Sequence, residues 1–217
     1  MADEIVLSFH DSLLKKSDLS LLEEGRWLND RLIGFVFDYF THNKFKQISD
    51  IAIFISPDVT QFLKLGGGLE IGIFLEPLDL LSRKLIFFAV NDNDSRHSAG
   101  GSHWSLLAYC RETNSFHHYD SSSSFNTSAA RSLAQNVEPF LHCRSGQNPS
   151  FKDDRCPQQQ NGCYDCGLYV VCITEQLCTN FMNNVKISLS DTLTPEDIRK
   201  KRKALKELVL SLGEKKT

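Results

Sequence analysis

The sequence predicts an α+β domain in which helices flank a central, mainly antiparallel sheet. Three β-rich runs, residues 84–90, 104–110 and 116–119, follow one another in the middle of the chain. Stretches with helical spacing of apolar residues lie before and after these runs, so helices and sheet are segregated along the sequence. No internal repeat or long linker interrupts the 217 residues, and we therefore expect one domain over residues 1–217.

The N-terminal elements begin with a short apolar-rich stretch over residues 5–9. A helix is expected next, with Asn29 or Asp30 as its N-cap. Its apolar residues recur at helical spacing, and they are Leu28, Leu32, Ile33, Val36, Phe37 and Phe40. A second helix is expected to begin at Ser56 and Pro57, because a serine cap and a proline suit the first turn, and to end before three consecutive glycines.

The β-rich runs that follow are expected to be neighbouring strands. A polar turn over residues 111–115 separates the second run from the third, which predicts a hairpin. Loops rich in Asn, Asp, Ser and Gly flank this hairpin at residues 91–102 and 121–128. One of these loops therefore precedes the first strand of the hairpin, and the other follows its second strand.

The C-terminal half of the chain is expected to be helical. Helical spacing covers residues 129–141, and an apolar run that starts at Cys166 predicts a helix to Thr179. Thr194 and Asp197 bracket a proline in a pattern close to a capping box, which predicts the start of a last helix. Its apolar face consists of Ile198, Leu205, Leu208, Val209 and Leu212.

The composition excludes several classes of protein. Twenty-four lysines and arginines against 27 aspartates and glutamates give a net charge of -3, which provides no overall positive field for nucleic acid. No apolar run approaches the roughly 20 residues that span a bilayer, and the first residues lack the pattern of a secretory signal. Seven cysteines, an odd number, favour an intracellular protein with reduced thiols, in the cytoplasm and/or nucleus.

Cys163 and Cys166 stand three apart in QQQNGCYDCGLYVV, a spacing shared by zinc sites and thioredoxin-type redox pairs. A four-cysteine zinc site would need scattered ligands in addition, such as Cys143 and Cys156. A redox pair would need a thioredoxin-like βαβ order, which the neighbourhood supplies only in part. The zinc site and the redox pair remain alternatives. The main expectation is a protein without a bound metal or cofactor.

Cys166 differs from the other cysteines, because Gly167 and the apolar helix after it place its sulfur at a helix N-terminus. The partial positive charge there favours thiolate, which is the nucleophilic form. His103 precedes one strand of the hairpin and Asp120 follows the other, so both return to the same end of the sheet. Taken alone, His103 could be a satisfied core or surface histidine and Asp120 a turn cap. Together with Cys166 they indicate a nucleophile, a base and an orienting carboxylate.

Such a site also needs donors for an oxyanion. The backbone amide of Cys166 is one, and a side-chain amide upstream could be another. Gln158, Gln159 and Gln160 are candidates, although a glutamine cluster is more often a solvated loop. Spacing alone leaves this choice open.

Four separated segments resemble the ubiquitin-like protein proteases, a family of desumoylases and deneddylases with a papain-like catalytic core. They are WLND at 27–30, HWSLLAY at 103–109, HYDS at 118–121 and QNGCYDCGLYV at 160–170. Flanking stretches such as FISPDVTQFL and FLEPLDL are most similar to the deneddylase branch. The resemblance covers nearly the whole chain and implies a cysteine protease.

The resemblance also implies the catalytic residues in chain order: His103, Asp120, Gln160 and Cys166. Cys163 departs from the family pattern. If it is an inserted residue, the structural equivalent of the oxyanion glutamine is Gln159, and the C-x-x-C spacing is coincidental.

The resemblance implies that the substrate is a peptide or isopeptide bond after the C-terminal Gly-Gly of a Nedd/Rub-type modifier. This bond would lie in the precursor of the modifier or in its conjugate with a protein such as a cullin. The enzyme is expected to be a monomer. Trp27 and Trp104 would cover a narrow channel that accepts an extended chain only where its residues are glycines. The alternative is that both tryptophans are core residues. Asp30, Asn91 and Asp92 would contact the modifier. A desumoylase, a catalytically silent binding module and a zinc-dependent interaction module remain alternatives.

Overall fold

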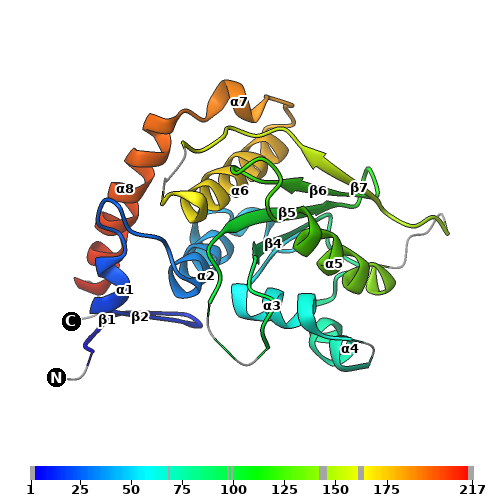
Figure 1. The fold of residues 1–217 in the computed structure, drawn as a ribbon, viewed down its shortest axis with the longest axis horizontal. Coiled ribbons are helices and arrows are strands. Elements are labelled where there is room, and N and C mark those ends of the chain that lie inside the picture. The colour runs from blue at the N-terminus through cyan, green and yellow to red at the C-terminus, as the bar shows by residue number, and fades with distance from the viewer. Residues whose placement is uncertain are drawn as a thin grey trace.

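A five-stranded sheet forms the centre of the protein (Figure 1). The computed structural model describes residues 3–67, 69–96, 98, 100–141, 146–160 and 164–214. In spatial order the strands are β3 (Ala52–Ile55), β4 (Leu85–Asn91), β5 (Trp104–Cys110), β6 (Ser115–Tyr119) and β7 (Ser150–Asp154).

The sheet is mixed in direction. β4, β5 and β6 are antiparallel, and β5 with β6 forms the predicted hairpin. The two edge strands, β3 and β7, run parallel to their neighbours and were not predicted. Each is short, and neither the apolar AIFI nor the polar SFKDD has a clear period of two. The sheet and its flanking helices confirm the predicted α+β class.

Helices cover both faces of the sheet (Figure 1). One face carries α2 (Asp30–Tyr39), α6 (Cys166–Met182) and α8 (Pro195–Glu214). The other carries α3 (Pro57–Leu65), α4 (Leu69–Leu75) and α5 (Thr127–Val137). Among the described residues, no helix is both long enough and apolar enough to cross a membrane.

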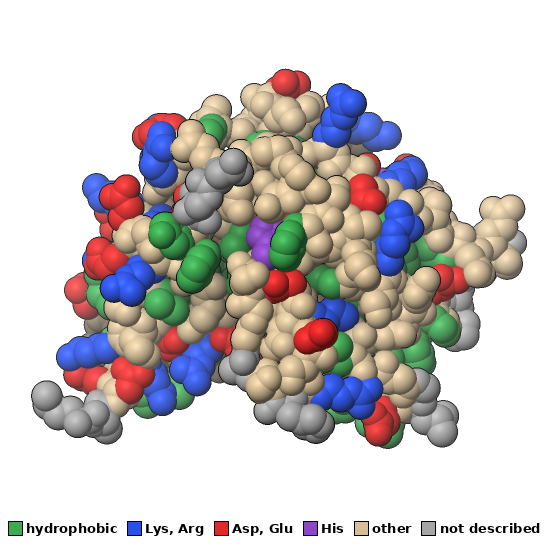
Figure 2. Space-filling model, viewed as in Figure 1, with side chains coloured by type: hydrophobic (Ala, Val, Ile, Leu, Met, Phe, Trp, Pro, Cys, Tyr) green, Lys and Arg blue, Asp and Glu red, His purple; other side chains and the backbone are tan. Residues whose placement is uncertain are grey.

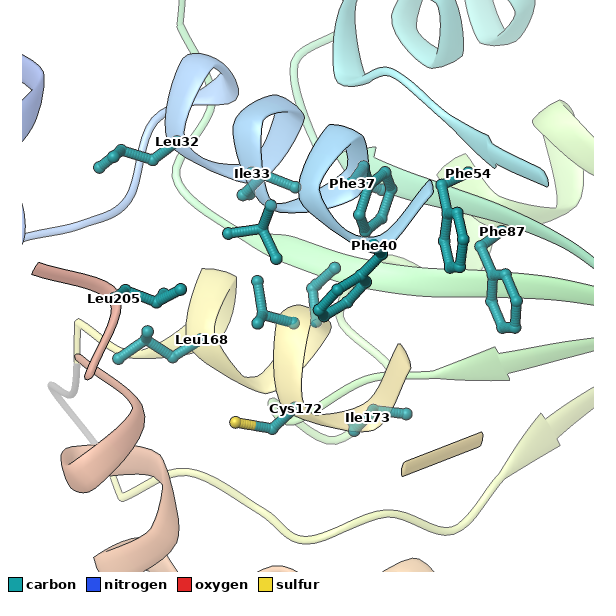
Figure 3. Close-up of a cluster of buried hydrophobic side chains, with 14 of the residues drawn as sticks. Leu32, Ile33, Phe37, Phe40, Phe54, Phe87, Leu168, Cys172, Ile173 and Leu205 are labelled. Carbon is teal, nitrogen blue, oxygen red and sulfur yellow. The ribbon is translucent and has the colours of Figure 1, made fainter. Parts of the chain in front are cut away.

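Two hydrophobic clusters lie on the two faces of the sheet. Alternate residues of β4 point to opposite faces, so that Phe87 belongs to one cluster and Phe88 to the other. Figure 3 shows the first cluster, in which the rings of Phe54 and Phe87 stack with centroids 5.2 Å apart. Cys172 is buried in the same cluster and acts as a small core residue.

The remaining elements are short. The chain begins with a hairpin and one turn of helix, β1 (Ile5–Phe9), β2 (Ser12–Lys15) and α1 (Lys16–Ser20), and α7 (Leu189–Thr192) precedes α8. A π-helical turn spans Phe40–Lys44, and 3-10 turns span Lys46–Ile48, Glu76–Leu78 and Glu138–Phe140. α8 packs closely on β1, since a Cβ at Gly213 would lie 2.5 Å from the carbonyl oxygen of Val6.

The helix starts follow the predicted caps. Asn29 accepts a hydrogen bond from the N–H of Leu32 at 3.0 Å, which makes Asn29 the N-cap of α2. Ser56 caps α3 in the same way. Thr194 and Asp197 exchange the hydrogen bonds of a capping box at the start of α8. α6 begins at Cys166, as predicted, and extends to Met182, three residues past the predicted end.

Candidate active site

The hairpin brings His103 and Asp120 together. His103 directly precedes β5 and Asp120 directly follows β6, so the antiparallel pairing returns both residues to one end of the sheet. The Nε2 atom of His103 lies 2.6 Å from Oδ1 of Asp120, and both residues are buried. The structure therefore contains the histidine–aspartate pair that the sequence predicted.

The carboxylate of Asp120 accepts two further hydrogen bonds. The N–H of Ser122 donates to Oδ1 and the N–H of Asn126 donates to Oδ2, both at 2.8 Å. Burial by itself would raise the pKa of Asp120, but the hydrogen bond from His103 and the two backbone donors outweigh burial and lower this pKa. Asp120 is therefore ionised at neutral pH and holds the Nε2–H of His103.

Cys166 is the first residue of α6 and is 1% exposed. Its side chain forms a hydrogen bond with His103, and because Asp120 occupies Nε2, the sulfur faces Nδ1. The helix start lies close to the segment that carries Trp27, since a Cβ at Gly167 would be 2.9 Å from the Cβ of Leu28. Only glycine allows this approach.

The surroundings raise the pKa of His103 to about 9. Burial acts in the opposite direction, but the hydrogen bonds with Asp120 and Cys166 and the negative charges of both partners outweigh it. The His103 ring is therefore the positively charged imidazolium, with a proton on each nitrogen, at neutral pH. It is placed to donate a proton to a leaving amine near Cys166.

A groove of about 600 Å³ lies beside this site. Its lining includes four of the five predicted substrate-binding residues, which are Trp27, Asp30, Asn91 and Trp104. The indole N–H of Trp104 donates to the carbonyl of Leu28 at 3.1 Å and so joins two walls of the groove. Trp27 is 54% exposed, which does not fit a core residue. Figure 2 shows a small histidine surface bordered by hydrophobic side chains near the centre of this face.

Asp92, the fifth predicted residue, does not line the groove. Its carboxylate accepts hydrogen bonds from the N–H and hydroxyl of Ser102, both at 2.7 Å, and from the N–H of His103 at 3.0 Å. Asp92 thus closes the base of the loop and fixes the backbone of His103. Position 101 in the same loop requires a glycine, since a Cβ at Gly101 would lie 1.9 Å from Oδ1 of Asn91.

The two candidate oxyanion glutamines have different surroundings. Gln160 is exposed and lines a second groove, together with Arg199 and Lys203 of α8. Gln159 is half-buried, and its N–H donates to the carbonyl of Ser121 at 2.9 Å, next to Asp120. Its Oε1 atom is buried without a hydrogen-bond partner among the described residues. The expectation for Cys163 lies outside the described residues, as do its neighbours 161 and 162.

Two residues of the turn after Asp120 were not predicted. Asn126 donates from Nδ2 to the carbonyls of Val90 at 3.2 Å and His103 at 3.3 Å, which joins β4 to the histidine. The ring of Phe125 lies edge-on to that of His103, with centroids 5.5 Å apart. The only signal in the sequence is one aromatic residue in the polar run SSSSFNTS directly after Asp120.

The described residues include only two of the four cysteines of the zinc alternative, Cys156 and Cys166. No three His, Cys, Asp or Glu side chains there are grouped to hold a metal ion. Cys143 and Cys163 lie outside the described residues. Burial raises the pKa of Cys156 to about 12, which disfavours the thiolate that zinc requires.

A cysteine at a helix start, a histidine paired with its sulfur and an aspartate that orients the histidine define a cysteine-type peptidase. The papain-like α+β fold fits the same class. Residues 72–215 match the Ulp1 protease family, C-terminal catalytic domain, and the chain belongs to this family. The resemblance that the sequence motifs indicated is therefore confirmed.

Individual relatives agree with this assignment. The chain is 50% identical to Sentrin-specific protease 8 of Homo sapiens over 214 residues, which is 98% of this chain and 100% of that protein. It is 38% identical to NEDD8-specific protease 1 of Arabidopsis thaliana, covering 82% of this chain and 77% of the relative. The solved structure of the C-terminal Ulp1 protease domain in complex with Smt3, the yeast ortholog of SUMO, matches with a TM-score of 0.73 at 20% identity, covering 98% and 89% of the two chains.

Proposed function

We propose that the protein cleaves the bond after the C-terminal Gly-Gly of a Nedd/Rub-type modifier, in precursors and in conjugates such as those of cullins. The observation that carries this proposal is the Cys166–His103–Asp120 arrangement beside a groove walled by Trp27 and Trp104. The name of the second relative above, NEDD8-specific protease 1, supports the choice of modifier. We further propose that residues 1–217 act as one catalytic domain, as a monomer, in the cytoplasm and/or nucleus.

The proposed reaction begins with attack by Cys166. Its sulfur forms a bond with the carbonyl carbon of the last glycine, and the carbon–nitrogen bond breaks as His103 gives its proton to the leaving amine. The resulting thioester is hydrolysed by a water molecule from which His103 takes a proton. Asp120 keeps the imidazole in one orientation through both steps.

The oxyanion formed by this attack needs preorganised donors. The backbone N–H of Cys166, at the start of α6, is the first. For the side-chain donor the structure supports Gln159 better than Gln160. Gln159 is half-buried beside the Asp120 end of β6, whereas Gln160 is exposed in a different groove.

The groove fits a glycine tail that follows a basic residue. Two tryptophans, Trp27 and Trp104, line this groove beside the catalytic residues. Asp30 and Asp58 both line the groove, and partial burial together with the charge of Asp30 raises the pKa of Asp58. A cation bound between these carboxylates would relieve their repulsion. A tail that carries an arginine ahead of its two glycines would supply such a charge.

Capture by modifiers that carry an electrophile at the C-terminus tests this function. We expect the protein to form a covalent product with the Nedd/Rub modifier and not with ubiquitin or SUMO at equal concentration. Cys166→Ala should abolish capture, because the sulfur is the attacking atom, and Cys163→Ala should retain it. Mass spectrometry of the product identifies the cysteine that reacted.

Three results would contradict the proposal. Selective capture of SUMO would indicate a desumoylase. Absence of capture by all three modifiers would indicate a binding module without activity. Equal loss of capture in both cysteine variants would return the C-x-x-C pair to consideration.

A further inference from the structure

Phe125 is an aromatic residue held against the histidine of the active site while most of its own surface faces solvent. It is 62% exposed, whereas His103 and Asp120 are each 5% exposed. Its ring meets the His103 ring at an interplanar angle of 79°. A single exposed apolar side chain is common on protein surfaces. The way in which the backbone presents Phe125 is the unusual feature.

The turn that carries Phe125 is fixed at both ends by the carboxylate of Asp120. The N–H groups of Ser122 and Asn126, on either side of Phe125, donate to its two oxygens. Between them, Ser123 and Ser124 have φ values of 50° and 70°, a left-handed conformation that costs free energy for residues other than glycine. The side chain of Gln158 accepts the N–H of Ser123 at 2.8 Å and stabilises this conformation.

The position of Phe125 relative to the reaction follows from the role of His103. A general acid must lie beside the atom that it protonates, so the leaving amine has to sit next to the imidazole. Phe125 contacts that imidazole directly. It does not belong to the lining of the groove between Trp27 and Trp104, which takes the glycine tail. Phe125 is therefore next to the position that the leaving amine must take beside the imidazole.

We propose that Phe125 forms the wall of the leaving-group side of the active site and packs against the methylene chain of the released lysine. The proposal rests on the isopeptidase function above. A lysine side chain offers a flexible four-carbon stem, and its nitrogen is an uncharged amide until the bond breaks. An aromatic ring beside the imidazole would shield that stem from water. Phe125 contacts only the stem, while the proton passes from His103 to the nitrogen.

Two substrates that share the modifier and differ on the leaving side test this role. One is the Nedd/Rub modifier joined to a lysine side chain in a peptide, and the other is the modifier with a C-terminal electrophile and no lysine. Phe125→Ala should lower kcat/KM for the lysine substrate by about tenfold, as expected when about two methylene groups lose their burial. Capture of the electrophilic modifier should be unchanged. Phe125→Leu should retain most of the activity on the lysine substrate.

Ile73→Ala supplies the matched control, since Ile73 is 71% exposed and lies on α4. This variant should leave both reactions unchanged. Equal loss on both substrates in Phe125→Ala would show that Phe125 acts on His103 and not on the lysine, and would overturn the proposal. No loss on either substrate would also overturn it. If the unaltered protein captured no modifier, the proposed function would fall, and the role of Phe125 with it.

Discussion

His103 combines two properties that seldom occur together, since it is buried and yet has a pKa raised to about 9. Its neighbours explain the combination, because Asp120 accepts from Nε2 and Cys166 occupies the other nitrogen. A second buried histidine, His118, also has an aspartate on one nitrogen, Asp153 at 2.8 Å, and Ser105 on the other at 3.0 Å. Ser105 is 1% exposed, so this second network joins strands and is closed to substrate.

The raised pKa of His103 predicts the alkaline limit of activity. kcat/KM should fall as the pH rises through about 9, because above that pH His103 has lost the proton that it donates. Asp120→Asn removes a charge and a hydrogen bond that raise this pKa, so the alkaline fall should move to lower pH. kcat should also decrease by at least about 10²-fold. The measurement is kcat/KM on a Nedd/Rub-linked substrate across the neutral and alkaline range.

Asp153→Asn is the control for this experiment, since it removes an aspartate from His118, a histidine whose other nitrogen is bonded to the buried Ser105 and not to Cys166. Its alkaline fall should stay near that of the unaltered protein. An unchanged fall in Asp120→Asn would mean that another group sets the limit.

The two glutamines before the nucleophile can be separated by substitution. Gln159→Ala should lower kcat by about 10²-fold with little change in KM, because an oxyanion donor acts mainly in the transition state. Gln160→Ala should have little effect, since Gln160 is exposed. Steady-state rates of both variants on one substrate decide between them. The opposite ranking would restore Gln160 as the donor, as the family resemblance of the sequence implied.

At the scale of elements, α8 is joined to the active site through one buried residue, Arg202. Its guanidinium donates to the carbonyls of Leu21 at 2.9 Å and Glu23 at 3.1 Å, in the segment that leads to Trp27. It also forms an ion pair with Asp165, at 2.7 Å, directly before Cys166. Arg202 therefore ties the last helix to both sides of the active site. Only a guanidinium has enough donors in one plane for these contacts.

Arg202→Met should destabilise the protein by about 2 kcal/mol, because the half-buried carboxylate of Asp165 loses an ion pair and two backbone carbonyls each lose a hydrogen bond. It should also lower the rate at which Cys166 captures an electrophilic modifier. Arg202→Lys should recover little of either loss. Added guanidinium ion, well below denaturing concentrations, should restore part of the capture rate of the Met variant.

Arg199→Met is the control for α8, since Arg199 is exposed and pairs with Glu196 on the same helix. It should change neither stability nor capture. Normal capture by Arg202→Met at a temperature where it is fully folded would show that Arg202 serves stability alone. Thermal unfolding and capture rates measured on the same samples separate these outcomes.

The elements that the sequence predicted share a local signal. α2, α3 and α8 begin at side-chain caps, and a cap is encoded within four residues. β7 was missed because its sequence SFKDD reads as a polar loop. It becomes a strand only by pairing with β6, where Asp153 and Asp154 meet His118 and His117. Such partners lie about 35 residues apart in the chain and leave no local pattern.

At the scale of the whole molecule, the active site joins segments from nearly the full length of the chain. The positions of His103, Asp120 and Cys166 could be predicted because each residue adjoins, or begins, a strand or helix whose place follows from local pattern. The contacts of Asn126 and Phe125, and the hydrogen bonds that Asp92 makes to Ser102 and His103, could not be predicted, since they depend on loop conformations that only tertiary hydrogen bonds determine. The two hydrophobic clusters share the central sheet, which supports the proposal of one domain.

The position of β7 at the edge of the sheet also bears on aggregation. An open edge presents unpaired N–H and C=O groups to any extended polypeptide, and this protein is proposed to accept extended tails. Three consecutive charged residues, Lys152, Asp153 and Asp154, occupy most of this edge. Charges on an edge strand oppose strand addition. Extended chains, and the sheets of other copies of the enzyme, are thereby discouraged from pairing with the β7 edge.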